Sequence, residues 1–590
     1  MKLFFDIAKY YLYFIILLLW SKIFFIFINY KNFLEDFVQL PFIWWNGLSL
    51  DLSLISYTII PLLALYVFTG DRAISRRIFK GYIISLTAII IVVLSVDPFF
   101  YKYWGGKVSL LFMQYIGEPK SAIASIEWLD LAYSFLFMLF CTRYAYRFIK
   151  KWDTLATKRG FGLIIILLVV AYLGRGGFGK NPIGISSAYY HQKALYNNAA
   201  LNPVWNLVAY EIDRESQSAV EFISQEQELL LMEEWKQNNA NSIGEIEFRD
   251  SSKVYLIVLE SFTNKNSLLF SGNLSNITPN LDRLAREGLF FTRAYSSSFR
   301  SDRGLTALIS GIPSLATQTL TNRPELLNRV PNLFKIFHDN GWYTSFHYGG
   351  NLDFANLRVL VNDADLVKEQ SDFSSSESGA WGFHDEVVFD AYLKDAMTKH
   401  EKAFHMLFSS SSHEPFKVPN FNKHTNSYEN SIAYADSCLG VLLNGIKELG
   451  DWDNSLVIIT ADHGTIMPER SVGYKSVNFN VPIVVAGGLL SIQPHDTLDE
   501  KGRIGTIVSQ FDIPKTLVDA LGQDELFEFS HSLMNPRGMA FYNYYNGIVL
   551  ISDSCKQFYD IPQKKYLHGS CGRPFEKAYF QSANRKIYKP

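Results

Sequence analysis

The strongest constraint in this 590-residue sequence is a series of long apolar runs within its first 175 residues. A helix needs about 20 predominantly apolar residues to cross the hydrocarbon core of a bilayer. Four runs have about that length and a fifth is shorter; they are Ile7 to Ile28, Ile43 to Phe68, Ile78 to Val96, Leu129 to Phe148 and Phe161 to Leu173. We therefore expect an N-terminal transmembrane domain of five helices over residues 1–175.

The distribution of charge predicts how these helices are oriented. The first 180 residues contain 19 Lys and Arg against 10 Asp and Glu, whereas the rest of the chain contains 36 against 47. Ten of the basic residues lie in the loops that follow the second and fourth runs. Because short basic loops are retained in the cytoplasm, we expect a cytoplasmic N-terminus. Five crossings then place everything after about Arg175 outside.

Two charged residues lie inside the predicted spans, Lys22 in the first and Asp51 in the second. An isolated charge within a bilayer costs several kcal/mol. Each lies about 10 Å from the outer face at a helix rise of about 1.5 Å per residue, so the two could pair across an antiparallel hairpin. The alternative is that each side chain extends separately towards headgroups or water.

Composition excludes several classes of protein. A hydrophobic content of 48% excludes a disordered chain. The basic excess falls among apolar runs, which argues against a nucleic-acid partner. Four cysteines in 590 residues exclude a disulfide scaffold. Cys555 and Cys571 fall in the predicted extracytoplasmic part, where a disulfide between them is compatible with the compartment.

Residues 176–250 differ from both flanking regions and are expected to form a linker with helices. They begin with Gly, Pro and Asn residues and continue into an acidic, helical stretch around Glu221 to Gln237. Residues 251–590 then alternate short β-rich runs with helical ones, which is typical of a parallel sheet with crossover helices. We expect an extracytoplasmic α/β domain with a mixed, mainly parallel sheet flanked by helices.

Polar clusters follow two of the predicted strands. The strand from Val254 to Leu259 ends at Glu260, and the strand from Ser455 to Thr460 is followed closely by Asp462 and His463. Open α/β sheets bind their ligands at the carboxyl ends of their strands. Carboxylate and imidazole side chains there provide oxygen and nitrogen ligands for a divalent cation.

A third polar element is the segment Phe-Arg-Ser301-Asp-Arg-Gly, which opens an apolar helix ending near Gly311. A hydroxyl at a helix N-terminus lies beside backbone N–H groups that suit a phosphate, and a nearby metal would make it a usable nucleophile. The alternative is that Ser301 serves only as a helix N-cap. Ser297 and Ser298 are nearby competitors, although neither opens the helix.

Together with the Ser-Ser-His413-Glu-Pro-Phe segment, these motifs resemble the lipoteichoic acid synthase and phosphoglycerol transferase family. That family belongs to the alkaline phosphatase and sulfatase superfamily, and its members carry five N-terminal helices before an extracytoplasmic sulfatase-like catalytic domain. The resemblance implies one divalent metal, Mn²⁺ or alternatively Mg²⁺, bound by Glu260, Ser301, Asp462 and His463. It also implies a multi-pass protein of the bacterial cell (inner) membrane.

The resemblance implies a transfer of phosphoglycerol from a membrane phospholipid such as phosphatidylglycerol to a glycan or polyglycerolphosphate acceptor. Ser301 would be the nucleophile, although the family usually has Thr there, and His413 would bind phosphate or protonate the leaving group. A conserved Trp of the family's headgroup site is absent here and an Arg is displaced. Candidate substrate-binding residues are His347, Arg300, Arg303, Asn356 and Arg358.

Three alternatives to phosphoglycerol transfer stay open. The first is a phosphoethanolamine transferase of the same superfamily, and the second is a phosphodiesterase that uses water as the acceptor. The third is a membrane lipid sensor with a sulfatase-like domain that has lost catalysis. The absence of Cys from the nucleophile motif excludes a sulfatase that depends on formylglycine.

Overall fold

The protein is described by a computed structural model. The structure describes residues 2–33, 37–69, 73–104, 107–108, 126–150, 152, 161–177, 183, 185–188, 190, 194–208, 221–237, 242–272, 276–315, 319–322, 324–327, 329–374, 378–398, 400–468, 473–492, 503–523, 526–545, 547–569 and 573–588. These residues form two compact units, the first lying within residues 1–216 and the second taking in residues 217–590.

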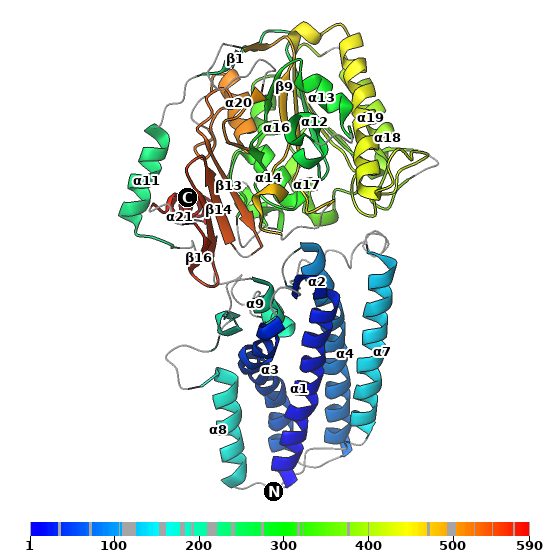
Figure 1. The fold of residues 1–590 in the computed structure, drawn as a ribbon, viewed down its shortest axis with the longest axis vertical. Helices are drawn as coiled ribbons and strands as arrows, with labels where there is room; N and C mark the ends of the chain where they lie inside the picture. The colour runs from blue at the N-terminus through cyan, green and yellow to red at the C-terminus, as the bar shows by residue number, and fades with distance from the viewer. Residues whose placement is uncertain are drawn as a thin grey trace. The chain divides into compact units, whose positions relative to one another are not determined.

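The first unit is made of helices, and its long ones lie side by side (Figure 1). Their apolar side chains form a common core that includes Tyr13, Leu17, Ile59 and Leu94. The helices are α1 (Lys2–Ile28), α2 (Tyr30–Phe33), α3 (Leu40–Thr69), α4 (Ala73–Trp104), α7 (Trp128–Lys150), α8 (Phe161–Arg175) and α9 (Ala194–Ala200).

Three of the described helical stretches are long and apolar enough to cross a membrane, namely Leu3–Ile28, Phe37–Leu65 and Ile74–Tyr103. They correspond to the first three predicted spans. The fourth and fifth predicted spans are helical as α7 and α8, but Leu163–Arg175 in α8 is a shorter apolar helix. The structure therefore supports an apolar helical unit and does not establish the predicted number of five crossings.

Charged side chains are buried between the helices of the first unit. Lys22 of α1 and Asp51 of α3 form an ion pair, which confirms the predicted pairing. Asn202 donates its side-chain N–H to the second carboxylate oxygen of Asp51 at 2.7 Å. A second buried pair joins Lys107 to Asp97 at 2.5 Å. Removing one member of such a pair leaves the other charge buried without its counterion.

We expect Lys22→Met to destabilise the first unit more than the double replacement Lys22→Met with Asp51→Leu. In the single variant the Asp51 carboxylate loses its Lys22 counterion and keeps the hydrogen bond from Asn202. An uncompensated buried charge lowers the free energy of unfolding by about 3–5 kcal/mol. The double variant removes that charge. Thermal unfolding of the full chain in detergent measures both effects, and equal losses in the two variants would show that the charges are not coupled.

The second unit is built on an eight-stranded sheet in the order β11-β3-β9-β8-β2-β7-β5-β6. The strands from β8 to β6 in this order pair in parallel, β9 is antiparallel to β8 and β3, and β11 is parallel to β3. The prediction of a mixed, mainly parallel sheet is confirmed. The strands are β11 (Arg503–Ile504), β3 (Leu289–Phe291), β9 (Ile483–Ala486), β8 (Ser455–Ala461), β2 (Lys253–Leu259), β7 (Ala403–Phe408), β5 (Tyr343–Tyr348) and β6 (Leu366–Lys368).

Helices pack on both faces of this sheet and bury its apolar side chains in two clusters. The central strand β2 is buried along its whole length, and its side chains alternate between the two clusters, as the two-residue period of a strand requires. One cluster includes side chains of α14 (Ser301–Ser310), α16 (Leu333–Asp339), α17 (Arg358–Val361) and α20 (Asp512–Ala520). The other includes side chains of α12 (Leu268–Ser271), α13 (Pro279–Ala285), α18 (Asp385–Ala396) and α19 (Ser427–Glu448).

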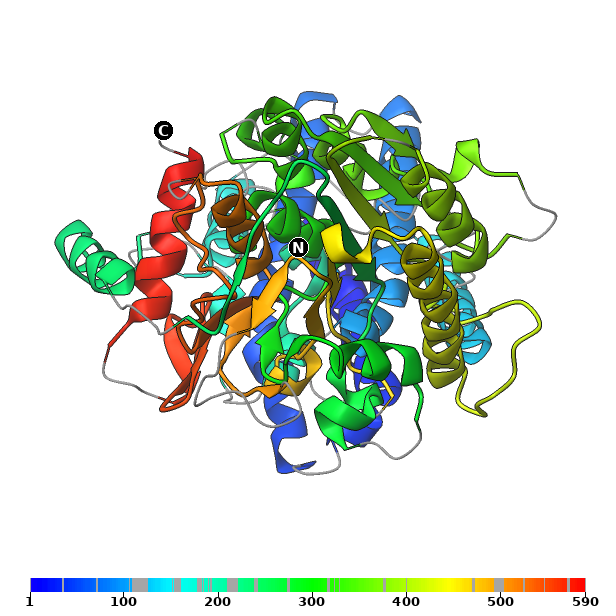
Figure 2. The ribbon, with the colours of Figure 1, turned by 90° about the horizontal axis from the view of Figure 1, so that it is seen from above.

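A smaller antiparallel sheet lies with α21 (Phe575–Tyr588) and α11 (Gln225–Gln237) at one end of the second unit, opposite α18 and α19 (Figure 2). Its strands are β13 (Met539–Tyr544), β14 (Gly547–Ser552), β15 (Lys556–Asp560) and β16 (Lys565–His568). The remaining elements are β1 (Gly244–Ile246), which pairs with β10 (Leu490–Ile492), β4 (Ala294–Tyr295), which pairs with β12 (Val508–Ser509), and α15 (Pro324–Leu327).

The cysteines of the second unit differ in their bonding. Cys555 is disulfide-bonded, whereas Cys438 in α19 is a buried free thiol. Cys571, the partner that the sequence predicts for Cys555, lies outside the described residues.

Candidate metal and nucleophile site

Glu260 lies at the carboxyl end of β2, in the centre of the large sheet, and is buried. Its backbone is held on both sides by the loop that follows the neighbouring strand β7. The Glu260 N–H donates to Ser409 Oγ at 2.8 Å, and Ser412 Oγ donates to the Glu260 carbonyl at 2.6 Å. These bonds fix the backbone of Glu260 and therefore the position from which its side chain extends.

Asp462 and His463 follow β8, which runs parallel to β2 with Ala461 beside Leu259. This register brings the Asp462 and Glu260 side chains to the same edge of the sheet. Asp462 Oδ1 accepts hydrogen bonds from the N–H groups of Ser261 at 2.9 Å and His463 at 2.7 Å. Asp462 Oδ2 is buried and has no hydrogen-bond partner within the described part of the chain.

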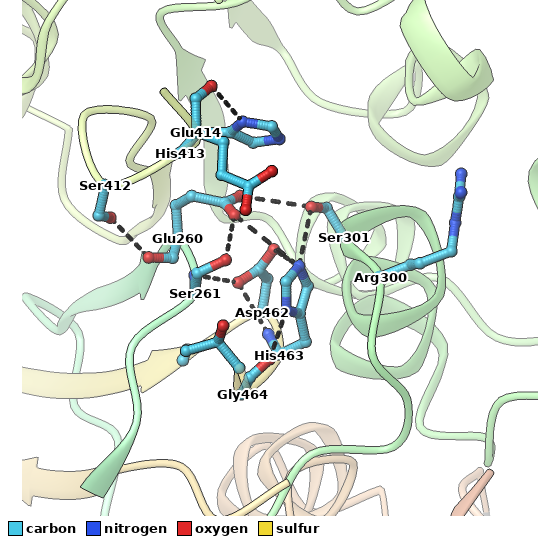
Figure 3. A network of polar contacts seen from close by, with 12 residues as sticks. Glu260, Ser261, Arg300, Ser301, Ser412, His413, Glu414, Asp462, His463 and Gly464 are labelled. Carbon is cyan, nitrogen blue, oxygen red and sulfur yellow. Dashed lines mark hydrogen bonds and ion pairs between the residues drawn. The ribbon is translucent and has the colours of Figure 1, made fainter. Parts of the chain in front are cut away.

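Glu260, Asp462 and His463 form a group suited to a cation, because one ligand atom from each lies within 4.8 Å of the others (Figure 3). His463 Nδ1 lies 2.8 Å from the carbonyl oxygen of Gly464, which can only accept, so Nδ1 carries a proton. In the neutral imidazole, Nε2 therefore presents a lone pair towards the carboxylates. Such a backbone bond is a common way to orient a metal-binding histidine.

The titration of this group reflects the concentration of negative charge. Burial and the nearby Glu260 carboxylate raise the pKa of Asp462 to about 7. Burial by itself would lower the pKa of His463, but Asp462 and Glu260 outweigh it and raise that pKa. Both shifts show that Asp462 and His463 favour an added positive charge. A divalent cation with oxygen and nitrogen ligands meets that requirement.

Ser301 is the first residue of α14, and its side chain points to this group (Figure 3). Ser301 Oγ lies 3.3 Å from Glu260 Oε2 and 3.5 Å from His463 Nε2. The N-cap of the helix is Arg300, so the alternative that Ser301 is only the N-cap is wrong. The close approach of α14 depends on Gly304, where a Cβ atom would lie 2.0 Å from the carbonyl oxygen of Asp462.

The competing serines have other surroundings. Ser297 is fully buried, and its hydroxyl accepts a hydrogen bond from the N–H of Ser314 at 2.6 Å. Ser298 is also fully buried, and its Oγ has no hydrogen-bond partner among the described residues. Of these three serines, Ser301 is the one for which the structure records hydrogen bonds to Glu260 and His463.

His413 follows the loop that holds Glu260, and its ring packs against Trp381 with the ring centres 4.3 Å apart. Its Nδ1 lies 3.0 Å from the Glu414 carbonyl, to which it donates, so Nε2 is unprotonated in the neutral ring. Burial is the main cause that lowers the pKa of His413 to about 4. His463 and Asp462 also act on this pKa, which shows that His413 lies within electrostatic range of the cation-binding group.

Three other predicted substrate residues, His347, Arg300 and Arg303, differ in their surroundings. His347 is buried in β5 with its ring 5.4 Å from that of Tyr392 in α18, and burial lowers its pKa to about 3. Arg300 points away from the cluster in Figure 3 and pairs with Asp302 at 3.1 Å. Arg303 Nε donates to Thr319 Oγ1 at 3.2 Å.

Asn356 and Arg358 lie in and after a short 3₁₀ turn that follows β5. Asn356 has a left-handed backbone conformation with φ of 55°. The Arg358 guanidinium binds Asp353 at 2.8 Å and Glu369 at 2.6 Å. Substrate roles for these residues stay predictions.

Several residues that support the site were not apparent from motifs. Asp385 at the start of α18 accepts the N–H groups of Ser410 at 2.8 Å and Ser411 at 3.1 Å, and so holds the loop that leads to His413. The buried ring of Tyr348 at the end of β5 lies within electrostatic range of Glu260 and Asp462. Gln510 binds the end of β8 from a distant part of the sequence. No local pattern marks these residues.

Comparison with known proteins indicates the class of protein that has this fold and these converging side chains. Residues 252–523 match the family model described as Sulfatase. The second unit also resembles a solved protein of the alkaline phosphatase superfamily from Vibrio parahaemolyticus, with a TM-score of 0.51 and 22% identity over 62% of this chain and 96% of that one. Residues 252–523 of the second unit thus form a sulfatase-like domain, which confirms the predicted resemblance at that level.

Named relatives of this chain are bacterial proteins, one of which is described as an inner membrane protein. The chain is 23% identical over 251 residues to the inner membrane protein YejM of Salmonella typhi, covering 41% of this chain and 38% of that protein. It is 20% identical over 332 residues to the lipoteichoic acid synthase-like protein YvgJ of Bacillus subtilis (strain 168), covering 51% of this chain and 52% of that protein. The chain thus matches about half, or less, of the length of these curated relatives.

Proposed function

We propose that this protein is a membrane-bound, metal-dependent transferase that moves phosphoglycerol from a phospholipid to a glycan or polyglycerolphosphate acceptor. The observation that supports it most directly is the position of Ser301 Oγ, within 3.5 Å of both Glu260 and His463. A hydroxyl that shares a site with cation ligands is the arrangement needed for a serine nucleophile. The similarity to a lipoteichoic acid synthase-like protein supports the choice of group transferred.

The residues present fit a divalent metal ion. Glu260, Asp462 and His463 would hold it together with Ser301 Oγ. Asp462 Oδ2 has no hydrogen-bond partner among the described residues and lies 3.4 Å from His463 Nε2. When bound, the metal would lower the pKa of the serine hydroxyl and neutralise charge on the phosphoryl oxygens. Manganese is the ion that the family resemblance favours, with Mg²⁺ as the alternative.

In the first step, Ser301 Oγ attacks the phosphorus of the donor headgroup. A bond forms between Oγ and phosphorus, and the bond between phosphorus and the lipid oxygen breaks. Ser301 Oγ releases its proton as it attacks and the lipid oxygen takes up one proton, both in exchange with solvent, so diacylglycerol leaves and the headgroup stays on Ser301 as a phosphodiester. In the second step an acceptor hydroxyl loses its proton and attacks the phosphorus, the bond between phosphorus and Ser301 Oγ breaks, and Ser301 Oγ takes up a proton.

His413 is proposed to handle the proton of the acceptor hydroxyl. With its pKa at about 4 it is neutral near pH 7, and its Nδ1–H is engaged with the Glu414 carbonyl. Its Nε2 is therefore a proton acceptor, which suits the second step better than donation to the leaving lipid oxygen in the first. This refines the role that the family resemblance implied for His413.

A lipid donor must be reached at the surface of the bilayer, and a first unit embedded in the membrane would keep the enzyme there. We propose that five helices span the bacterial inner membrane from a cytoplasmic N-terminus, with the catalytic domain outside. In this scheme residues 1–175 form the membrane domain, residues 176–250 the linker and residues 251–590 the catalytic domain. Three apolar helices and the similarity to an inner membrane protein support this arrangement.

We expect the purified full chain, supplied with Mn²⁺ and phosphatidylglycerol, to gain the mass of one phosphoglycerol ester on the peptide that contains Ser301. Peptide mass spectrometry after a short incubation without acceptor measures this, because the second step is then slow. Parallel samples with phosphatidylethanolamine test the rival headgroup, and Ser301→Ala is the control. An ethanolamine ester would support the alternative transferase. Absence of any ester on a protein with bound metal would contradict the proposal.

A further inference from the structure

Gln510 is a fully buried polar residue that comes directly after the two-residue strand β12. β12 pairs in parallel with β4, and the Gln510 N–H donates to the Tyr295 carbonyl at 2.8 Å. β4 leads into the segment that ends at Ser301, so this pairing brings Gln510 to the base of the nucleophile segment. No motif in the sequence points to it.

The Gln510 side chain joins the two parts of the site. Its Nε2 donates to the carbonyl oxygens of Ala461 and Asp462, the latter at 2.7 Å. Its Oε1 accepts the N–H of Ser297 at 3.1 Å. Both hydrogens on Nε2 and the side-chain carbonyl oxygen are thus hydrogen-bonded. A reversed amide would place Oε1 against two carbonyl oxygens and Nε2 against an N–H group.

These contacts connect a predicted cation ligand to the predicted nucleophile. Asp462 is at one end of the Gln510 amide, and at the other end Ser297 is four residues before Ser301. Ser297 is held further by the N–H of Asn543, which donates to its carbonyl at 3.0 Å. The Gln510 amide therefore bridges the backbone of Asp462 and the backbone of Ser297, which precedes Ser301 in the same segment.

The choice of Gln over Glu or an apolar residue follows from the same contacts. A glutamate at this position would place a carboxylate against two carbonyl oxygens and add negative charge beside the Asp462 carboxylate. A methionine would fill the volume but leave two buried carbonyl oxygens without these donors, which is costly. Only a neutral side chain with paired donors and an acceptor satisfies all three partners.

We infer that Gln510 is a positioning residue that sets the separation between the cation-binding group and Ser301. It touches neither the substrate nor the reacting atoms, and it acts through the backbones of Asp462 and Ser297. The inference rests on the proposed metal-dependent transfer, because its consequence is a change in metal affinity and in turnover. Residues that orient metal ligands from outside typically contribute 10- to 100-fold to affinity or activity.

The test compares Gln510→Met with Gln581→Met in the full chain. Gln581 is also buried, donates to Ile223 and Glu228, and accepts the N–H groups of Phe222 and Ile223, so its loss removes a similar set of bonds between α21 and the α11 region. Binding of Mn²⁺ is measured by calorimetry with Ser301 intact and with no phosphodiester present. Hydrolysis of bis(p-nitrophenyl) phosphate is measured with Ser301 intact and metal saturating.

We expect Gln510→Met to weaken Mn²⁺ binding by roughly 10- to 100-fold, and to lower kcat at saturating Mn²⁺ with a smaller change in KM. Gln581→Met should lose thermal stability while keeping both values. Gln510→Asn, which keeps the amide but is shorter by one methylene, should give smaller losses of the same kind and serves if the Met variant does not fold. Unchanged affinity and kcat in a folded Gln510 variant would overturn the inference. A wild type that binds no metal would instead overturn the proposed function.

Discussion

Ser301→Ala is expected to reduce kcat for phosphodiester cleavage by about 10⁴- to 10⁶-fold, the range seen when an enzyme loses its nucleophile. The reason is geometric, because Ser301 Oγ lies 3.3 Å from Glu260 Oε2 and 3.5 Å from His463 Nε2, and alanine leaves no oxygen there. Turnover of bis(p-nitrophenyl) phosphate by the purified full chain with Mn²⁺ measures the effect. This soluble substrate separates the chemistry from access to a lipid donor.

Two variants serve as controls for the nucleophile. Ser301→Thr keeps a hydroxyl at the start of α14 and is expected to retain most of the activity. Ser298→Ala removes a buried hydroxyl that has no hydrogen-bond partner within the described residues, and is expected to change kcat little. A Ser301→Ala protein with wild-type kcat, or a Ser298→Ala protein without activity, would show that the assignment is wrong.

Asp462→Asn is expected to abolish tight metal binding and to remove a specific pH dependence of stability. Burial and Glu260 raise the pKa of Asp462 to about 7 in the metal-free fold, against about 3.9 in an unfolded chain. The folded state therefore binds this proton more tightly. Its contribution to the free energy of unfolding is fully present below about pH 4 and is lost as the pH rises through 7, a total of about 4 kcal/mol.

The measurement is the unfolding temperature of the full chain between pH 5 and pH 8, first with a chelator and then with saturating Mn²⁺. Other buried carboxylates, such as Asp436 and Asp512, have raised pKa values and contribute with the same sign. The difference between wild type and Asp462→Asn removes their part. Without metal, wild type should lose stability relative to Asp462→Asn as the pH rises.

Added Mn²⁺ should reverse that trend in the wild type, because the metal replaces the proton and binds the ionised ligands. Stabilisation by a ligand at 1,000 times its Kd is about 4 kcal/mol, which is similar in size to the proton effect. Asp462→Asn should show little stabilisation by Mn²⁺ at either pH. The same pH dependence and the same response to Mn²⁺ in both proteins would exclude Asp462 as the centre of the cation site.

The residues of the predicted metal site were accessible from the sequence because each one follows an apolar strand or opens a helix. A buried strand such as β2 or β8 is marked by its composition, and open α/β sheets bind their ligands at the carboxyl ends of such strands. The adjacency of Glu260 and Asp462 required only that β2 and β8 be neighbours in a parallel sheet. Because Leu259 lies beside Ala461, the residues that follow the two strands lie at the same edge of the sheet.

Other parts of the prediction depended on long-range packing and were less secure. Arg300 has the charge to bind a phosphate, but burial beside Asp302 pairs the two side chains. The same arginine, rather than Ser301, is the N-cap of α14, because the chain turns into the helix one residue earlier than the hydroxyl suggested. Local sequence does not specify the backbone conformation of the residues that precede a helix, so it did not identify the N-cap of α14.

The sequence by itself indicated the apolar helices of the first unit, the α/β class of the second and the polar residues Glu260, Asp462 and His463 that follow two of its strands. These features depend on apolar length, strand period and residues adjacent to strand ends, all of which are local. Only the tertiary structure decided that Lys22 pairs with Asp51, that burial lowers the pKa of His413 and that the Gln510 side chain bonds both Asp462 and Ser297. Each of these depends on burial or on contacts between residues far apart in the chain, which no local pattern specifies.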